Sequence, residues 1–104
     1  MAEFVNPFSG MMPDRKLNDR DLTRAIRMAL AAEEEAVHMY EAMADASDNA
    51  FAATVLQDIA DEERVHAGEF QELLRILVPD EQSLLQKGSA EVQELAAEEK
   101  ECKE

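Results

Sequence analysis

Apolar residues recur every three or four positions along two stretches of the chain, residues 18–46 and residues 50–78. This is the spacing of an amphipathic α-helix, in which positions i, i+3, i+4 and i+7 share one face. Asn18 is a suitable N-cap for the first helix, and Pro79 stops the second. Only residues 47–49, which are polar, separate the two stretches. The sequence therefore predicts an antiparallel helical hairpin.

The segments on either side of this hairpin are less regular. Residues 1–17 contain two prolines and a glycine, a composition that favours an extended arm. Within residues 79–104 we expect one turn of helix that ends at Gly88, then a short helix over residues 90–101 and an acidic tail. No stretch alternates in the manner of a β-strand. The predicted fold is all-α, a two-helix hairpin plus a short C-terminal helix.

Each predicted helix carries one carboxylate in the middle of its apolar face. At 100° per residue, the apolar positions within about 40° of Glu63 are Ala52, Leu56, Ile59, Ala67, Phe70, Leu74 and Leu77. The corresponding positions around Glu33 are Leu22, Ile26, Ala29, Val37, Tyr40 and Ala44. A carboxylate in a core face costs several kcal/mol unless it is compensated. Both residues are therefore candidate metal ligands.

Glu33 and Glu63 also fall at one level of the predicted hairpin. Each lies 15 residues from position 48 in the turn, or about 22 Å along its helix. His66 follows one turn after Glu63 and completes a Glu-x-x-His motif. Di-metal carboxylate centres take a Glu from each of two bundle helices and Glu-x-x-His from two others. Because one chain supplies half of that set, and oxygen with imidazole suits iron or manganese, the sequence predicts two iron ions per pair of subunits.

A second Glu-x-x-His motif, Glu35 and His38, points elsewhere. Glu35 lies about 200° and His38 about 140° around the helix from Glu33, away from its apolar face. The two residues fit either a solvated surface or an auxiliary metal-binding position. Tyr40 lies two turns after Glu33 on the apolar face. Its position is consistent with packing in the core. It is equally consistent with a hydrogen bond to a ligand carboxylate or with a redox-active role beside the centre.

The chain is strongly acidic, with 24 Asp and Glu against 10 Lys and Arg and a formal net charge of −14. Such a field repels nucleic acid and anionic membranes and concentrates cations. The single cysteine, Cys102, excludes an intramolecular disulfide. Without a signal-peptide pattern or an apolar run near the roughly 20 residues of a membrane span, we expect a cytoplasmic protein. Two helices bury little apolar surface, so we also expect a homo-oligomer.

Residues 31–40, AAEEEAVHMY, and residues 61–66, DEERVH, resemble the corresponding segments of the encapsulated ferritins. More broadly they resemble the ferritin and rubrerythrin group, and the likeness extends over about residues 18–95. This resemblance implies a two-helix protomer that pairs with a second subunit into a ferritin-like four-helix bundle. It also implies rings of ten subunits housed inside an encapsulin shell, where the iron mineral is stored.

The same resemblance implies a di-iron ferroxidase centre whose ligands come from two subunits: Glu33, Glu63 and His66. It places Tyr40 beside this centre and matches Glu35 to an acidic position through which metal enters. The chain departs from the family pattern at Ala32, where many relatives carry a further acidic residue, and at Met39, where they often carry tryptophan.

The function implied is the oxidation of Fe(II) to Fe(III) for iron storage in an encapsulin nanocompartment of the cytoplasm. Two alternatives stay open. A rubrerythrin-like di-iron protein would reduce peroxide, but such proteins usually need a thiolate iron site, which one cysteine cannot build. A non-catalytic acidic helical interaction module would pair Glu33 and Glu63 with arginines of a partner. No nucleic acid or membrane partner is expected.

Overall fold

The structure, a computed structural model, describes residues 16–103, and the side chain of residue 103 is not described. Three helices make up this part of the chain: α1 (Asp19–Ala46), α2 (Ala50–Leu77) and α3 (Glu81–Lys103). No strand occurs within these residues, so the all-α prediction is confirmed. Most of the predicted N-terminal arm, residues 1–15, lies outside the described part. No helix within residues 16–103 is both long and apolar enough to cross a membrane.

Two asparagines fix the beginnings of the hairpin helices. The side-chain oxygen of Asn18 accepts a hydrogen bond of 2.8 Å from the backbone N–H of Asp21. Asn49 accepts one of 3.0 Å from the backbone N–H of Ala52. Each cap satisfies a backbone donor that the first turn of a helix leaves unpaired. The helices therefore begin where the sequence predicts them.

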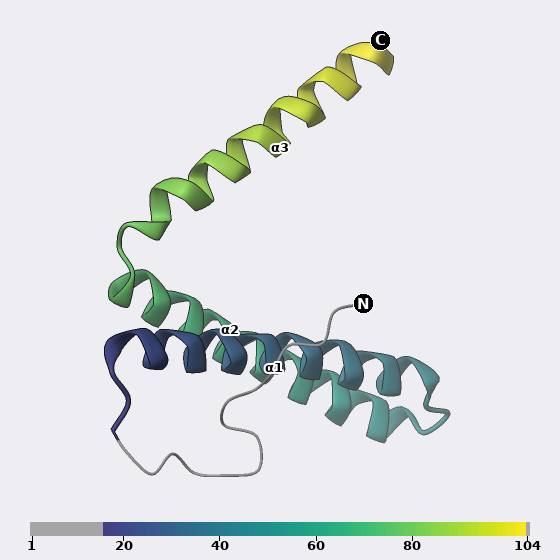
Figure 1. The fold of residues 1–104 in the computed structure, drawn as a ribbon. Coiled ribbons are helices and arrows are strands. Elements are labelled where there is room, and N and C mark those ends of the chain that lie inside the picture. Colours follow the sequence, from purple (N-terminus) through teal and green to yellow (C-terminus); the bar gives the residue numbers. More distant parts are fainter. Residues whose placement is uncertain (1–15, 104) are drawn as a thin grey trace, which may run out of the picture.

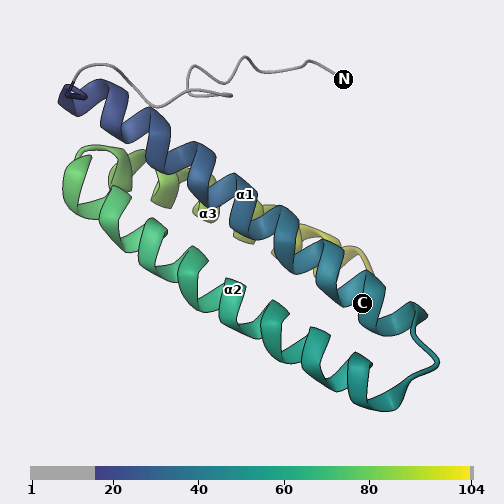
Figure 2. The same ribbon diagram turned by 90° about the horizontal axis from the view of Figure 1, so that it is seen from below.

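The helices α1 and α2 run side by side in opposite directions, as Figure 1 and Figure 2 show. Among the described residues, the buried hydrophobic core between them is small: Ile26, Ala44, Ala60, Ala67 and Leu74. Its alanines let the two backbones approach closely. Larger apolar side chains of the hairpin stay partly exposed, and Met39 and Met43 are each 48% exposed. A core this small leaves much of the predicted apolar face without cover.

Polar contacts across the hairpin hold its register. Arg64 on α2 donates hydrogen bonds to Glu41 on α1, at 2.8 Å, and to Asp61 in its own helix, at 2.9 Å. Gln57 donates to Glu41 as well, at 3.1 Å. The hydrogen bond from Arg64 holds the pKa of the Glu41 carboxyl below its usual value. These exposed contacts contribute little stability individually, but they favour one alignment of α1 with α2.

The C-terminal helix is longer than the sequence suggested. α3 runs without a break from Glu81 through Gly88 to Lys103, whereas we expected an interruption at Gly88 and a separate acidic tail. A single glycine costs a helix about 1 kcal/mol. That cost is too small to end a segment whose other residues are mostly good helix formers. Within residues 81–103 the acidic tail is therefore part of the helix.

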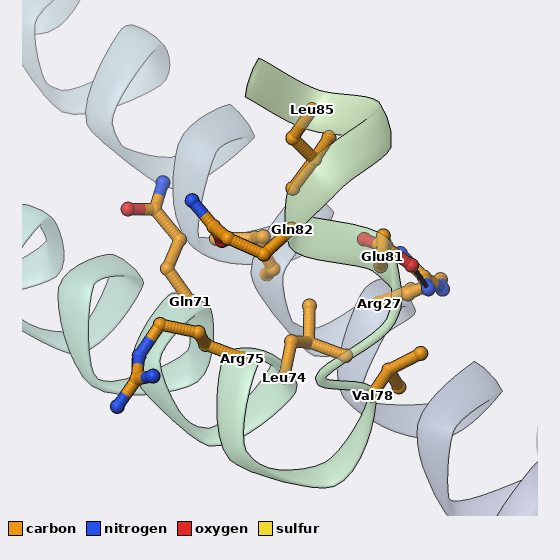
Figure 3. A pocket seen from close by; sticks show the side chains of 9 residues that line it. Arg27, Gln71, Leu74, Arg75, Val78, Glu81, Gln82 and Leu85 are labelled. Atoms are coloured by element: carbon orange, nitrogen blue, oxygen red, sulfur yellow. Dashed lines mark hydrogen bonds and ion pairs between the residues drawn. The ribbon is translucent and has the colours of Figure 1, made fainter. Parts of the chain in front are cut away.

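α3 projects away from the end of the hairpin (Figure 1). An ion pair between Arg27 of α1 and Glu81 joins its first turn to the hairpin and keeps the pKa of the Glu81 carboxyl below its usual value. A pocket of about 260 Å³ lies at this elbow, with Leu74 and Leu85 among its lining residues (Figure 3). Further along, Val92 and Leu95 are about two thirds exposed. The hairpin alone therefore does not cover the apolar side chains of α3.

Candidate metal centre

One group of metal-ligating side chains stands out within the described residues. Glu33 of α1 and Glu63 with His66 of α2 each offer one ligand atom, and these atoms all lie within 4.8 Å of one another. The Nδ1 atom of His66 is 3.4 Å from Oε2 of Glu63 and 3.6 Å from Oε2 of Glu33. The antiparallel register of α1 and α2 thus brings together three residues that are far apart in the sequence.

The two carboxylates are less exposed to solvent than charged side chains usually are. The side chains of Glu33 and Glu63 are each 21% exposed, whereas that of His66 is 51% exposed. The Oε2 atom of Glu33 is fully buried and has no hydrogen-bond partner. Within residues 16–103, neither carboxylate forms an ion pair with a lysine or arginine. A buried acceptor without a partner costs about 1–3 kcal/mol, so this group needs compensation from something that binds.

The chemistry of the donors fits a metal ion of the iron or manganese type. Carboxylate oxygen and imidazole nitrogen are present and thiolate is absent from the group. A cation bound here would pair with the buried Oε2 atom of Glu33, which has no hydrogen-bond partner. One chain supplies three ligand residues, fewer than the four ligands of even a tetrahedral metal site. A single copy therefore leaves at least one coordination position to water or to another group.

A hollow of about 470 Å³ opens beside the group. Its lining combines Glu33 and His66 with Glu69, Phe70 and Leu73 of α2. Glu69 is not among the residues predicted from the sequence, although its spacing from His66, three residues along one helix, is a signal for a shared face. The charged residues that line the hollow are two carboxylates, and the lining includes no lysine or arginine. In the single chain, water and small cations can therefore reach Glu33 through a hollow lined by carboxylates.

The other predicted site residues lie outside this group. Glu35 and His38 are both exposed on α1, and the metal-ligating group does not include them. Tyr40 is half-buried two turns after Glu33. None of the hydrogen bonds found within residues 16–103 joins Tyr40 to a member of the group. The roles assigned to these three residues from the sequence stay predictions.

Comparison with known proteins gives consistent matches. Residues 24–104 match the rubrerythrin family. The chain is 45% identical over 77 residues to an encapsulin nanocompartment cargo protein of Myxococcus xanthus, covering 74% of this chain and 58% of that protein. It is 38% identical over 82 residues to a ferritin-like–encapsulin shell fusion protein of Pyrococcus furiosus, covering 79% of this chain and 24% of that protein. The chain thus spans less than two thirds of the length of either relative.

A solved structure agrees with these matches. The crystal structure of an encapsulated ferritin domain from Pyrococcus furiosus superimposes with a TM-score of 0.80 at 34% sequence identity. The likeness covers 92% of this chain and 97% of that domain. It therefore extends over nearly the whole of both chains.

Proposed function

The chain belongs to the rubrerythrin family of ferritin-like proteins, and we propose that it is a ferroxidase. In this proposal it oxidises Fe(II) to Fe(III) at a di-iron centre formed between two subunits, and the product is stored as mineral. The observation that carries the proposal is the buried Oε2 atom of Glu33, which has no partner although it lies 3.6 Å from Nδ1 of His66. A bound cation satisfies that oxygen, whereas a surface ion pair with a partner's arginine would not require burial.

A second copy completes the centre. The face of the hairpin that carries Glu33 and His66 also carries Leu73, and helix rotation puts the half-exposed Met43 and Val55 on the same side. Packing this face against the same face of another hairpin produces a four-helix bundle and brings two ligand sets together. Four carboxylates then balance the charge of two Fe(II) ions while both imidazoles stay neutral. We propose this pair as the unit of a homo-oligomer, with a ring of ten implied by family resemblance.

The protein's own residues position Fe(II), which is the substrate. Glu33 and Glu63 hold the two ions by their carboxylate oxygens, and His66 binds through a neutral ring nitrogen. Two Fe(II) ions give one electron each to O₂, which takes up two protons and leaves as hydrogen peroxide; peroxide itself is the other candidate oxidant. The chain contributes a fixed metal–metal separation, charge balance and coordination positions open to the oxidant. Tyr40, half-buried two turns after Glu33, would hydrogen-bond a ligand carboxylate or lie beside the centre as a redox-active side chain.

The names of two relatives support a proposed location. One is named as cargo of an encapsulin nanocompartment and another as a ferritin-like domain fused to an encapsulin shell. We propose that this chain likewise works inside an encapsulin shell in the cytoplasm, with the shell protein as its partner. Its net charge of −14 favours the accumulation of iron cations around it.

Metal analysis tests the proposal. Purified protein loaded anaerobically with Fe(II) and then desalted should retain about one iron per chain, since two ligand sets share two ions. Elemental analysis by plasma mass spectrometry measures this ratio, and absorbance in the near ultraviolet follows oxidation after air is admitted. Absence of iron would favour the acidic interaction module instead. Iron that reacts with peroxide but not with O₂ would favour a peroxide-reducing protein of the rubrerythrin kind.

Glu35 should have a modest effect on this reaction. It is exposed on α1 and stands outside the ligand group, and Ala32 lacks the carboxylate that many relatives carry near it. Glu35→Ala should change the initial rate of Fe(II) oxidation by about twofold and leave the bound iron unchanged, because an exposed charge acts through screened attraction. The effect should shrink at high salt. Loss of the iron centre in this variant would mean that Glu35 faces inward.

A further inference from the structure

The pocket at the elbow between α2 and α3 has an apolar lining and a volume of about 260 Å³ (Figure 3). All three helices contribute apolar side chains to it: Leu30, Leu74, Val78 and Leu85. Leu74 is buried, whereas Leu85 is 58% exposed. The pocket is smaller than the roughly 300–1,000 Å³ of most small-molecule sites. It therefore suits an apolar side chain better than a free ligand.

The elbow pocket opens on the side of the hairpin away from the proposed contact between subunits. At 100° per residue, its lining residues Gln71 and Arg75 lie about 80° and 120° around α2 from Glu63. Leu73, which lines the hollow beside the ligand group, lies about 80° from Glu63 in the opposite sense. Pairing of two hairpins through the ligand face therefore leaves the elbow pocket uncovered.

The pocket also lies where α3 joins the hairpin. The ion pair between Arg27 of α1 and Glu81 of α3 stands on its rim. Both partners keep solvent contact, and an ion pair of this kind contributes little stability. An apolar side chain seated in the pocket would contact all three helices and so hold α3 in one direction relative to the hairpin.

The fifteen residues before Lys16 supply a segment that fits this pocket. Residues 4–13, FVNPFSGMMP, carry no charged side chain, although charged residues make up 33% of the chain. Pro7 and Pro13 restrict the backbone, which lowers the entropy lost when the segment becomes ordered. The large apolar side chains available as anchors are Phe4, Phe8, Met11 and Met12.

This arm joins α1 at the end of the hairpin that carries the pocket. Figure 1 and Figure 2 both place the first turn of α1 at the end where α2 passes into α3. Leu30 of the pocket lies 12 residues after the N-cap Asn18, or about 18 Å along α1. Phe8 precedes Asn18 by ten residues, which span up to about 33 Å when extended. Phe8 therefore reaches the pocket without a fully extended arm, whereas Met12, with about 20 Å, needs a nearly straight path.

We propose that the N-terminal arm folds back along α1 and seats Phe8 in the elbow pocket of its own chain, against Leu74 and Leu85. The docked arm closes the pocket and fixes the direction of α3. The inference uses no residue of the metal centre, so it stands apart from the proposed function and can be tested without metal.

Methyl NMR spectroscopy of the full chain tests where the arm lies. A nitroxide is attached at Ser9→Cys in a Cys102→Ser background, and the leucine and valine methyl signals are compared before and after the nitroxide is reduced. The signals of Leu74 and Leu85 should be strongly attenuated, because attenuation falls steeply with distance from the nitroxide. The signal of Leu95, ten residues further along α3, should be unaffected.

Two substitutions test whether Phe8 is the anchor. Phe8→Ala should restore the signals of Leu74 and Leu85. It should also speed hydrogen exchange of the backbone amides in the first turns of α3 by about tenfold, since the burial of one aromatic side chain is lost. Mass spectrometry of peptides from residues 81–88 measures this exchange. Phe51→Ala, a matched change at a phenylalanine that is 78% exposed on α2, should change neither readout.

A mixed sample separates the arm of the same chain from that of a second copy. In this sample the spin-labelled copies carry no isotope and the isotope-labelled copies carry no nitroxide, so the methyl signals should stay intact. Attenuation of Leu85 in the mixture would overturn docking within one chain. Attenuation that persists in Phe8→Ala would overturn Phe8 as the anchor. Signals of Leu74 and Leu85 that do not respond to the nitroxide in any sample would overturn the inference as a whole.

Discussion

Glu63→Ala and His66→Ala should each abolish rapid oxidation of Fe(II). Both residues offer ligand atoms within 4.8 Å of Glu33, and the loss of one in each subunit removes two ligands from the shared centre. Mutation of a residue that only orients a metal ligand typically lowers metal affinity or activity by about tenfold to a hundredfold. Removal of a ligand itself should therefore lower the initial rate by at least about a hundredfold. Absorbance of the ferric product after mixing with aerobic Fe(II) measures this rate.

The chain offers matched controls for both variants. Glu62→Ala removes an exposed carboxylate next to Glu63, and Val65→Ala shortens an exposed side chain next to His66. Both controls should oxidise iron at close to the unmodified rate. All four variants should keep their helical circular dichroism, because Glu63 and His66 contribute no cap or register contact. Iron oxidation at the normal rate in both Glu63→Ala and His66→Ala would show that the ligand assignment is wrong.

Metal should drive the association of subunits. Without metal, pairing two hairpins brings two copies of Glu33 and two of Glu63 together in a seam from which water is excluded, and their repulsion opposes the dimer. A divalent ion that binds only the paired state removes this penalty. At a metal concentration one hundred times the dissociation constant, it stabilises the pair by about 2.7 kcal/mol, or roughly a hundredfold in the association constant.

Native mass spectrometry across a range of Fe(II) concentrations measures this shift directly. The population should move from monomers to dimers and larger rings as metal is added, and chelation should reverse the change. Glu33→Gln should reduce the dependence on metal, since it removes one carboxylate charge per subunit from the seam while it preserves the size of the side chain. A distribution that does not respond to metal would contradict a centre shared between subunits.

The hairpin was open to prediction because its determinants are local. Asn18 and Asn49 cap their helices through bonds to residues three positions away, and such contacts depend on the immediate sequence alone. Helical rise and rotation then give the faces and levels of Glu33 and Glu63 by counting from the turn. The prediction that the helix ends at Gly88 was wrong. The helix-forming tendency of the residues around Gly88 outweighs the cost of one glycine.

The amino-acid sequence by itself determined the helical hairpin, the level at which the two carboxylates meet and the choice of His66 over His38, since each depends on helix geometry. Only the tertiary structure decided which oxygen of Glu33 is buried without a partner, how near His66 lies to both carboxylates, and that Glu69 shares a hollow with them. These features depend on the distance and tilt between α1 and α2. Buried side chains such as Ala60 and Ala67 set the distance between the helices through their packing. The periodicity of a single helix carries no information on this packing.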